Sequence, residues 1–342
     1  MQRRGPTAGT FAARWRGAVP WLVAVLATAA VVATAPAADT GGSTARQVLG
    51  GEQLRIMAPA SPGGGWDQTS REMQSALRDL IGRSEVYNVS GAGGTIGLSQ
   101  FLRHRGDPSQ LMATGLIMIG AVGTNGTPHD VSETTPLLRL TTDFQVVVVP
   151  ADSPIRDLDG LVAAMRADLP GVSIAGGSAG GAEHILAGLM AQAIGGDPAR
   201  ISYVAHSGGG EMLSTVLSGR ATAGISGFSE ILPQIEAGSV RALAVSSARR
   251  LPGLPDVPTL REGGVDVELE NWRGVVAPPG ITAQEERALE ELLVEMTRTP
   301  RWQEALRRRG WGDATLAGPE FEEFVRAEQE RVNRILDEIG LG

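Results

Sequence analysis

The chain has 342 residues, of which 42% are hydrophobic and 20% charged, and its formal net charge is −8. This length and balance suit two ordinary globular domains with buried cores and exclude a multi-span membrane protein. All 30 basic residues are Arg and there is no Cys, which excludes lysine Schiff bases, the Walker phosphate-binding loop, thiolate nucleophiles, cysteine metal sites and disulfides.

The first 38 residues have the pattern of a secretory signal peptide. Four basic residues come first: Arg3, Arg4, Arg14 and Arg16. They precede an apolar stretch at residues 18–35 and a few small residues, which end at Asp39. The apolar stretch is long for a signal peptide but short for a membrane-spanning helix, which needs about 20 residues. We therefore expect residues 1–38 to be a signal peptide that exports the protein, with an uncleaved anchor as the alternative.

The exported chain is acidic. Removal of residues 1–38 takes away 4 Arg and no acidic residue, which leaves 26 Arg against 38 Asp and Glu and a net charge of −12. Nucleic acids and anionic membranes favour clustered basic side chains, so we expect neither as a partner. Residues 39–51 are rich in Gly, Ser and Thr and are expected to form a flexible leader.

From residue 53 onward, short apolar strands, glycine-rich turns and amphipathic helices alternate, which is typical of α/β architecture. The first strands and helices are expected at residues 53–59, 67–80, 85–89, 95–102 and 111–115. An apolar run at 144–149, ending at Pro150, is interpreted as a crossing into a second lobe. In that lobe we expect strands near 172–175, 201–205, 221–226 and 240–246, and helices that begin near Arg156, Gly181, Gly210 and Phe228.

The C-terminal part is expected to return to the first lobe through a strand at 265–278 and then to become helical. Thr282 with Glu285 forms a capping-box pattern, and Gly318-Pro319 precedes a last helix with one apolar side. The chain is therefore divided into lobe one, residues 52–148 and 266–342, and lobe two, residues 149–265. Two crossings between similar lobes predict a cleft with a hinge beneath it, an arrangement that closes on a small ligand.

Four glycine-rich turns lie where a predicted strand ends and a predicted helix begins. They occupy residues 62–67, 91–95, 176–181 and 207–210. At such a turn the first N–H groups of the helix lack internal partners, and the helix dipole places about half a positive charge there. Because these turns gather at the carboxyl ends of the strands, all four are expected to converge on one small anion. The alternative for any single turn is that glycine merely makes it tight.

Two residues of the first turn, Trp66 and Asp67, have an expected structural role. Trp66 is expected either to pack on a ligand or to cover the hinge. Asp67 is expected to be the N-cap of the first helix, where its carboxylate would orient the loop rather than contact a ligand directly.

Enzyme alternatives rest on short motifs. Residues 176–180 match the Gly-x-Ser-x-Gly nucleophile elbow around Ser178, but only His184 and His206 follow it, both close in sequence. The turn at 91–94 has the wrong spacing for a dinucleotide fingerprint. The two histidines with Glu183 could ligate a metal, but they lack metal-site spacing, so a hydrogen-bonding role of the histidines at the cleft is preferred.

Several ordered motifs resemble the solute-binding component of tripartite tricarboxylate transporters, the Bug-type extracytoplasmic receptors. The motifs are PASPGGGWD at 59–67, GAGGTIG at 91–97, PQIEAG at 233–238 and VRALAV at 240–245. The resemblance extends from about residue 54 to the C-terminus. It implies a two-lobed, type II-like periplasmic-binding-protein fold with a ligand cleft between the lobes, and a periplasmic location.

The resemblance also implies a function without catalysis. A receptor of this family captures a small carboxylate and delivers it to a membrane permease of one large and one small subunit, and we expect a monomer without cofactor, metal or catalytic residues. Family loops that hold a ligand carboxylate through backbone amides and water match positions 64–67 and 92–95, and the second-lobe turn matches 178–184. The expected ligand-binding residues are Gly64, Gly65, Trp66, Asp67, Ala92, Gly93, Gly94, Thr95, Ser178, Gly180, His184, His206, Ser207, Gly208, Gly227 and Phe228.

Two departures from the common family pattern touch the expected pocket. Many members have Tyr-Lys-Gly where this chain has His206-Ser207-Gly208, and Phe-Asp-Ser where it has Ser226-Gly227-Phe228. Loss of the Asp removes a carboxylate that would repel a multiply charged anion or bind an amino group, whereas loss of the Lys acts in the opposite direction. The expected ligand is therefore a di- or tricarboxylate such as citrate. A secreted serine hydrolase using Ser178 and a receptor that senses rather than transports are the alternatives.

Overall fold

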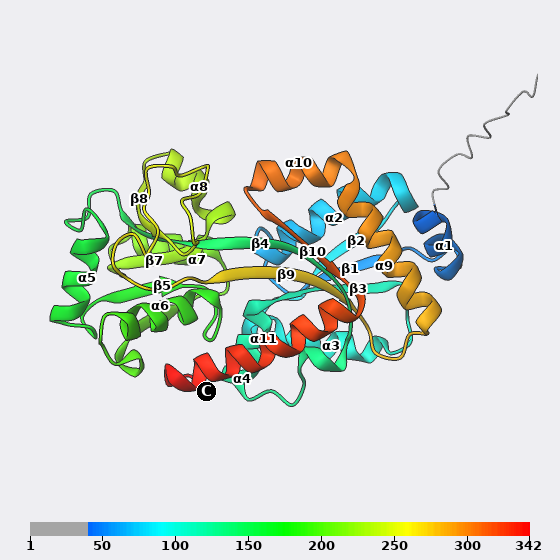
Figure 1. The fold of residues 1–342 in the computed structure, drawn as a ribbon, viewed down its shortest axis with the longest axis horizontal. Coiled ribbons are helices and arrows are strands. Elements are labelled where there is room, and N and C mark those ends of the chain that lie inside the picture. The colour runs from blue at the N-terminus through cyan, green and yellow to red at the C-terminus, as the bar shows by residue number, and fades with distance from the viewer. Residues whose placement is uncertain (1–39) are drawn as a thin grey trace, which may run out of the picture. The chain divides into compact units, whose positions relative to one another are not determined.

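The computed structural model describes residues 40–342, so the predicted signal peptide lies outside the described residues. Two β-sheets share one long strand, β4 (Thr135–Pro150), and helices pack around them (Figure 1). This part of the chain forms one compact unit by its contacts. The α/β alternation expected from the sequence is confirmed.

The first sheet has the strand order β2-β1-β3-β9-β4, with β10 also paired to β4. Strands β1, β2 and β3 are parallel, whereas β9 is antiparallel to both of its neighbours. The strands are β1 (Arg55–Ala58), β2 (Glu85–Asn88), β3 (Gln110–Gly115), β9 (Glu270–Ala277) and β10 (Gly312–Ala317). The accompanying helices are α1 (Thr40–Val48), α2 (Gly65–Ile81), η1 (Ala92–Gly94), α3 (Thr95–Phe101), η2 (Leu102–His104), α4 (Leu116–Asn125), η3 (Val131–Glu133), α9 (Ala283–Arg298), α10 (Pro300–Arg309) and α11 (Gly318–Glu338).

The second sheet has the order β4-β7-β5-β6, and β8 pairs with the other edge of β4. Its strands are β5 (Ser173–Gly176), β6 (Ser202–Ala205), β7 (Ala223–Gly227) and β8 (Val240–Val245). Its helices are α5 (Leu158–Ala167), α6 (Ala182–Ala193), η4 (Pro198–Arg200), α7 (Gly209–Leu217) and α8 (Phe228–Glu236). We refer to the elements around the first and second sheets as lobe one and lobe two.

Strand β4 carries the chain from one sheet to the other. Residues 135–144 pair with β9, and residues 145–150 pair with β7 and β8. The run Val146–Val149 is buried on both faces, which explains why it is continuously apolar. The pairing partner changes at Phe144 and Gln145, inside the region where the sequence analysis placed the crossing. Strand β9 brings the chain back beside β4 (Figure 1).

Residues 39–51 do not form the expected flexible leader. Helix α1 occupies residues 40–48, and the side chains of Ala45 and Leu49 are buried in the core of lobe one. Arg46 also donates a hydrogen bond to the carbonyl oxygen of Leu80, at the end of α2. The Gly, Ser and Thr content suggested flexibility, but two apolar contacts at helical spacing hold the segment on the protein.

The C-terminal helix signals are confirmed. Thr282 Oγ1 accepts from the Glu285 N–H, and the Glu285 carboxylate accepts from the Thr282 N–H, which completes a capping box at the start of α9. Helix α11 begins at Gly318, with Pro319 in its first turn. Helix α4 was not predicted, because its residues are apolar on nearly every side and give no amphipathic pattern.

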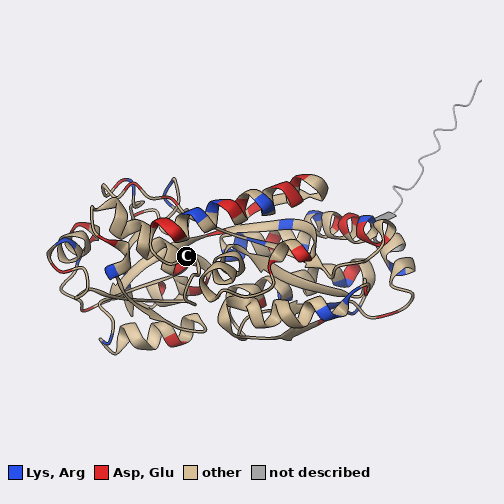
Figure 2. Cartoon of the chain, turned by 90° about the horizontal axis from the view of Figure 1, so that it is seen from below, with Lys and Arg blue, Asp and Glu red and all other residues tan. Residues whose placement is uncertain are grey.

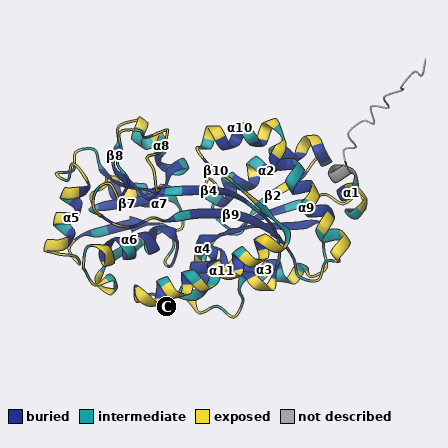
Figure 3. Ribbon diagram, viewed as in Figure 1, coloured by how far each residue is buried: buried dark blue, intermediate teal, exposed yellow. Residues whose placement is uncertain are grey.

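The central strands are more buried than the outer surfaces of the helices. Figure 3 shows that β4 and β9 are buried along most of their length, while the outer sides of α5, α9 and α11 are exposed. In the view of Figure 2, acidic and basic residues are interspersed rather than segregated. None of the helices in residues 40–342 is both long enough and apolar enough to cross a membrane.

Candidate ligand-binding site

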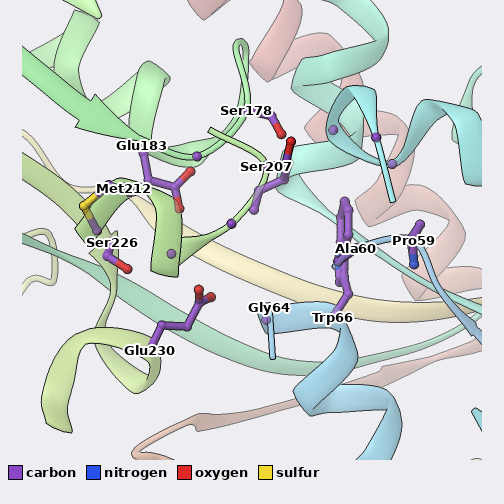
Figure 4. A pocket seen from close by; sticks show the side chains of 18 of the residues that line it. Pro59, Ala60, Gly64, Trp66, Ser178, Glu183, Ser207, Met212, Ser226 and Glu230 are labelled. Carbon is purple, nitrogen blue, oxygen red and sulfur yellow. The ribbon is translucent and has the colours of Figure 1, made fainter. Parts of the chain in front are cut away.

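A pocket of about 90 Å³ lies between the two lobes, where strand-to-helix turns from both meet (Figure 4). Lobe one contributes the turns before α2 and η1, and lobe two contributes the turns before α6, α7 and α8. A cavity of about 150 Å³ is known to bind benzene, so the volume of this pocket suits a small ligand. The predicted convergence of glycine-rich turns from both lobes is therefore present.

The turn between β1 and α2 brings the start of a helix to the pocket. Gly64 is the N-cap and has an extended backbone. As a glycine, it provides no capping side chain. A Cβ at position 65 would lie 2.6 Å from Nη2 of Arg273 and 3.0 Å from Oε1 of Glu230, so only glycine allows these side chains to approach. Trp66 is 6% exposed and lies on the opposite side of the pocket from Glu183 and Glu230 (Figure 4).

Asp67 is not the N-cap that the sequence analysis predicted. It lies three residues after Gly64, and its carboxylate accepts hydrogen bonds from the Gly63 N–H at 2.8 Å and from Asn88 Nδ2 at 2.9 Å. Arg71 Nε donates to it at 3.0 Å. Burial acts to raise the pKa of Asp67, but these hydrogen bonds hold the pKa below its usual value. The carboxylate therefore orients the loop and is already fully engaged.

The turn between β2 and α3 is a run of left-handed backbone. Gly91, Ala92, Gly93 and Gly94 have φ values of 126°, 48°, 62° and 91°. Ala92 is the one non-glycine residue with positive φ among the described residues, and such a conformation is strained for a side chain with a Cβ. Successive N–H groups in turn conformations of this kind form a concave surface that suits an anion.

The turns of lobe two place two hydroxyl groups near this run. Ser178 and Ser207 both line the pocket and lie together at its upper side in Figure 4. A Cβ at Gly93 would lie 3.7 Å from the Cβ of Ser178, so the two lobes are close at this point. Gly208 is the N-cap of α7, and Gly208 and Gly209 line the pocket, so the start of that helix also lies at the cleft.

Arg273 is the buried cation of the site. It comes from β9, is 2% exposed, and donates from Nη2 to Oδ2 of Asp143 on β4 at 3.0 Å. Oε1 of Glu230 is 3.9 Å from the same nitrogen, and Trp311 lies against the guanidinium. Its Nη1 is buried without a hydrogen-bond partner among the described residues. Arg273 was not predicted, because nothing in a strand pattern shows that one residue reaches a distant turn.

Two carboxyl groups from lobe two also face the pocket. Glu183 is in the first turn of α6 and Glu230 in the first turn of α8, and their carboxyl groups point toward each other across the pocket in Figure 4. Burial raises the pKa of both groups to about 7. Arg273 opposes this shift in both cases and Asp143 adds to it. Oε2 of Glu183 has no hydrogen-bond partner among the described residues.

About half of the expected ligand-binding residues line this pocket: Gly64, Gly65, Trp66, Gly93, Gly94, Ser178, Ser207 and Gly208. Of the remaining ones, Ala92 and Thr95 belong to the second turn, where Thr95 Oγ1 donates to the Ala92 carbonyl oxygen at 2.9 Å. Gly180 lies against α4, because a Cβ there would be 2.2 Å from Oγ1 of Thr124. Gly227 lies beside the carboxylate of Asp143, beneath the pocket, and Phe228 is buried in the core of lobe two.

The two histidines hold the turns of lobe two. His184 stacks on Tyr203 with ring centroids 4.0 Å apart, and its Nδ1 accepts from the Gly180 N–H at 3.2 Å. Burial lowers the pKa of His184 to about 4, so the ring is neutral. His206 contacts the Gly176 carbonyl oxygen at 3.1 Å and Oγ1 of Thr215 at 2.8 Å. The structure thus places both histidines in hydrogen bonds with the scaffold.

This geometry bears on the enzyme alternatives. Within the described residues, no hydrogen bond joins Ser178 to either histidine, so the nucleophile and base of a hydrolase are not paired here. No group of three or more His, Asp or Glu side chains in residues 40–342 is arranged to hold a metal ion. The site is instead a polar cleft pocket built from helix N-termini, hydroxyl groups and a buried charge cluster.

Comparison with solved structures shows which fold this chain has. Periplasmic binding protein BugD is 22% identical, with a TM-score of 0.76 over 84% of this chain and 98% of that one. An R. palustris protein with adipate is 24% identical, with a TM-score of 0.77 over 84% and 97%. MatC from Rhodopseudomonas palustris with bound malate is 21% identical, with a TM-score of 0.73 over 83% and 98%. The predicted two-lobed periplasmic-binding-protein fold is thereby confirmed.

Sequence comparison defines the family. The model of the tripartite tricarboxylate transporter family receptor matches residues 69–341, and the chain belongs to that family. Protein BugT of Bordetella pertussis is 29% identical over 233 residues, 66% of this chain and 71% of that protein. A protein encoded between tcbD and tcbE in Pseudomonas sp. strain P51 is 28% identical over 290 residues, 83% of this chain and 85% of that protein. The predicted resemblance to Bug-type receptors is confirmed.

Proposed function

We propose that this protein captures a small organic carboxylate in the cleft between its lobes and delivers it to the membrane subunits of a tripartite tricarboxylate-type transporter. The observation that carries the proposal is the convergence of helix N-termini from both lobes on one small pocket. Such N-termini attract anions through free N–H groups and the helix dipole. Family membership supports the receptor role, and two similar structures hold the carboxylates malate and adipate.

The finer expectation of a citrate-like di- or tricarboxylate needs a correction to its premise. It rested on the loss of one family Asp from the expected pocket, but Glu183 and Glu230 both line the pocket. A ligand with several carboxylates would meet these groups at close range. The proposal is therefore made for a small carboxylate, and citrate is retained as a test compound.

The proposed setting is the periplasm, with a monomeric receptor and no catalytic step. The acidic mature chain would rely on local backbone dipoles, not on its net charge, to attract an anion. The engagement of His184 and His206 in scaffold hydrogen bonds supports binding over hydrolysis at Ser178. A sensing role would use the same cleft, and only the partner would differ.

A ligand screen tests the proposal. The mature chain, residues 39–342, would be heated with citrate, succinate, malate, adipate, propionate, aspartate and β-alanine, and p-nitrophenyl esters would be assayed for turnover in parallel. A ligand at about 100 times its Kd stabilises the native state by about 2.7 kcal/mol, which raises Tm by several degrees. We expect such a shift with at least one carboxylate and no ester turnover. Ester cleavage that disappears in Ser178→Ala, with no shift for any carboxylate, would overturn the proposal.

A further inference from the structure

The pocket has two chemically different ends. One end, here called the donor end, consists of the Gly93–Gly94 backbone with the hydroxyl groups of Ser178 and Ser207. The other, here called the acid end, consists of the carboxyl groups of Glu183 and Glu230. Figure 4 shows the labelled serines at the upper side, Glu183 to their left and Glu230 below Glu183. A ligand that spans the pocket therefore meets hydrogen-bond donors at one end and acceptors at the other.

The acid end has more negative than positive groups. Asp143, Glu183 and Glu230 supply three carboxyl groups, and Arg273 supplies one guanidinium. Arg273 is already bonded to Asp143 at 3.0 Å, and Glu230 is farther from it, at 3.9 Å. One cation thus leaves the two pocket-facing glutamates only partly compensated. A second carboxylate on the ligand would add repulsion at this end.

An unpartnered buried acceptor marks the same end. Glu183 is 8% exposed, and its Oε2 has no hydrogen-bond partner among the described residues although it lines the pocket. A buried acceptor of this kind is unfavourable unless another molecule supplies a donor. Glu230 lies between the starts of α2 and α7, since a Cβ at Gly65 or Gly209 would be 3.0 or 3.1 Å from its oxygens. Oε2 of Glu183 thus lacks a donor, whereas Glu230 is positioned at the helix starts and accepts from the Gly65 N–H.

We propose that the pocket is specific for a small amino carboxylate, with the ligand carboxylate at the donor end and its ammonium group between Glu183 and Glu230. This inference rests on the proposed function. An ammonium group supplies three donors and one positive charge, so it satisfies Oε2 of Glu183 and offsets the excess of carboxyl groups. A methyl or carboxylate group in the same position would leave that oxygen unpaired or repel it.

Matched ligand pairs test this assignment. β-Alanine against propionate, 4-aminobutyrate against butyrate, and aspartate against succinate differ only in the amino group. Titration calorimetry at pH 8 on residues 39–342 should show the amino member binding at least tenfold more tightly in the pair that fits the pocket. Malate is the control for a neutral donor, because its hydroxyl group replaces the amino group of aspartate.

Three variants separate a direct role from a structural one. Glu183→Gln and Glu230→Gln keep the side-chain shape, and each should reduce the amino preference to less than threefold while leaving propionate and succinate binding equal or tighter. Glu236→Gln is the matched control, because Glu236 lies exposed at the far end of α8. It should retain the full preference. Tm values of all variants check that each one is folded.

The outcomes distinguish the two proposals. Equal binding of amino and plain carboxylates, an equal gain with malate, or an unchanged preference in both Gln variants would overturn the amino carboxylate assignment while leaving a carboxylate receptor. Absence of binding by every carboxylate in both series would overturn the proposed function itself.

Discussion

Arg273 and Asp143 form a buried ion pair beneath the pocket, with side chains 2% and 0% exposed. Each partner offsets part of the penalty of burying the other, and the hydroxyl group of Ser229 donates a further bond to Asp143 at 2.9 Å. Asp143 is on β4 and Arg273 is on β9, so the pair links the two strands that carry the chain between the lobes beneath the pocket.

Removal of one partner should be more harmful than removal of both. We expect Arg273→Met to lower the free energy of unfolding by about 3–5 kcal/mol, because it leaves the Asp143 carboxylate buried without its cation. The double variant Asp143→Asn, Arg273→Met should recover more than half of that loss. Urea denaturation of the wild type and the variants measures the effect. A loss below about 1 kcal/mol in the single variant would contradict the expectation that Asp143 is left as an uncompensated buried charge.

The glutamates at the acid end should make stability depend on pH. Their pKa is about 7 in the folded state against an ordinary value of 4.5. Below pH 4.5 both states hold the proton, and between pH 4.5 and 7 the unfolded chain releases it first. These groups therefore destabilise the fold progressively as pH rises through that window. Arg273 on β9, Asp143 on β4 and Tyr203 on β6 are the charged or titratable groups that face them.

Replacement of Glu183 by Gln should remove its share of this dependence. The difference in the free energy of unfolding between Glu183→Gln and the wild type should shift in favour of the variant by roughly 2–3 kcal/mol from pH 4.5 to pH 7.5. Denaturant titrations of both proteins at several pH values measure this difference. The contributions of the other titrating groups cancel, because both proteins contain them. A gain that stays constant with pH would contradict the raised pKa.

At the residue scale, sequence reasoning located the turns but not the charges that complete the site. Glycine and serine at a strand-to-helix junction are local signals, so Gly64, Gly93 and Ser178 could be predicted. Glu183 was considered only as a possible metal ligand, and Glu230 was not singled out, because acidic residues are common in the first turn of a helix. Their role depends on Arg273, which is distant in sequence and meets them only in the folded protein.

Among the elements, α11 has contacts in both lobes. Near its start, Phe321 packs edge-on against Trp272 of β9, with ring centroids 6.1 Å apart. Just beyond its end, Ile339 is 1% exposed and lies against Gly188 of α6, where a Cβ would be 2.7 Å from Ile339 Cδ1. Residues 266–342 are expected in lobe one from the sequence, and the contact with lobe two was not predicted. Helix α11 is therefore a third link between the lobes, besides β4 and β9.

Truncation of this link should destabilise the protein. Ile339→Ala removes a buried side chain where α11 meets lobe two, and we expect it to lower the free energy of unfolding by about 2–4 kcal/mol. Thermal and urea unfolding measure the loss. Ile96→Ala is the matched control, since Ile96 is 46% exposed and should change stability by less than about 1 kcal/mol. Equal effects of the two substitutions would contradict the packing of α11 on α6.

Helices α9 and α11, which have a capping or start motif in the sequence, were predicted at the correct positions. Helices α1 and α4, which have no such motif, were missed or misinterpreted. The capping box of α9 and the Gly-Pro start of α11 lie at their expected positions. Helix α4 was missed, because it is buried on most sides and shows no polar face. Helix α1 was read as flexible, because its stabilising contacts with α9 and Leu80 involve residues far away in the sequence.

For the whole molecule, two long strands beneath the pocket and a helix at its side connect the lobes. Strand β4 exchanges its partners at Phe144 and Gln145, close to Asp143 and directly under the site. A ligand that bridges the donor end and the acid end would contact both lobes, so its binding would favour the arrangement in which the lobes lie together. The two-lobed arrangement could be predicted from the alternating strands and helices, whereas the change of partner within one continuous strand could not.

Titration calorimetry with a pocket-filling variant tests the central claim most directly. Succinate, citrate and β-alanine would be titrated into residues 39–342, into Ser207→Trp, which fills the cleft, and into Ser214→Trp, which places the same side chain on an exposed position of α7. We predict one binding site per chain for at least one of these carboxylates, loss of binding by tenfold or more in Ser207→Trp, and unchanged binding in Ser214→Trp. Binding that survives Ser207→Trp, or absence of binding in the wild type, would contradict a carboxylate site between the lobes.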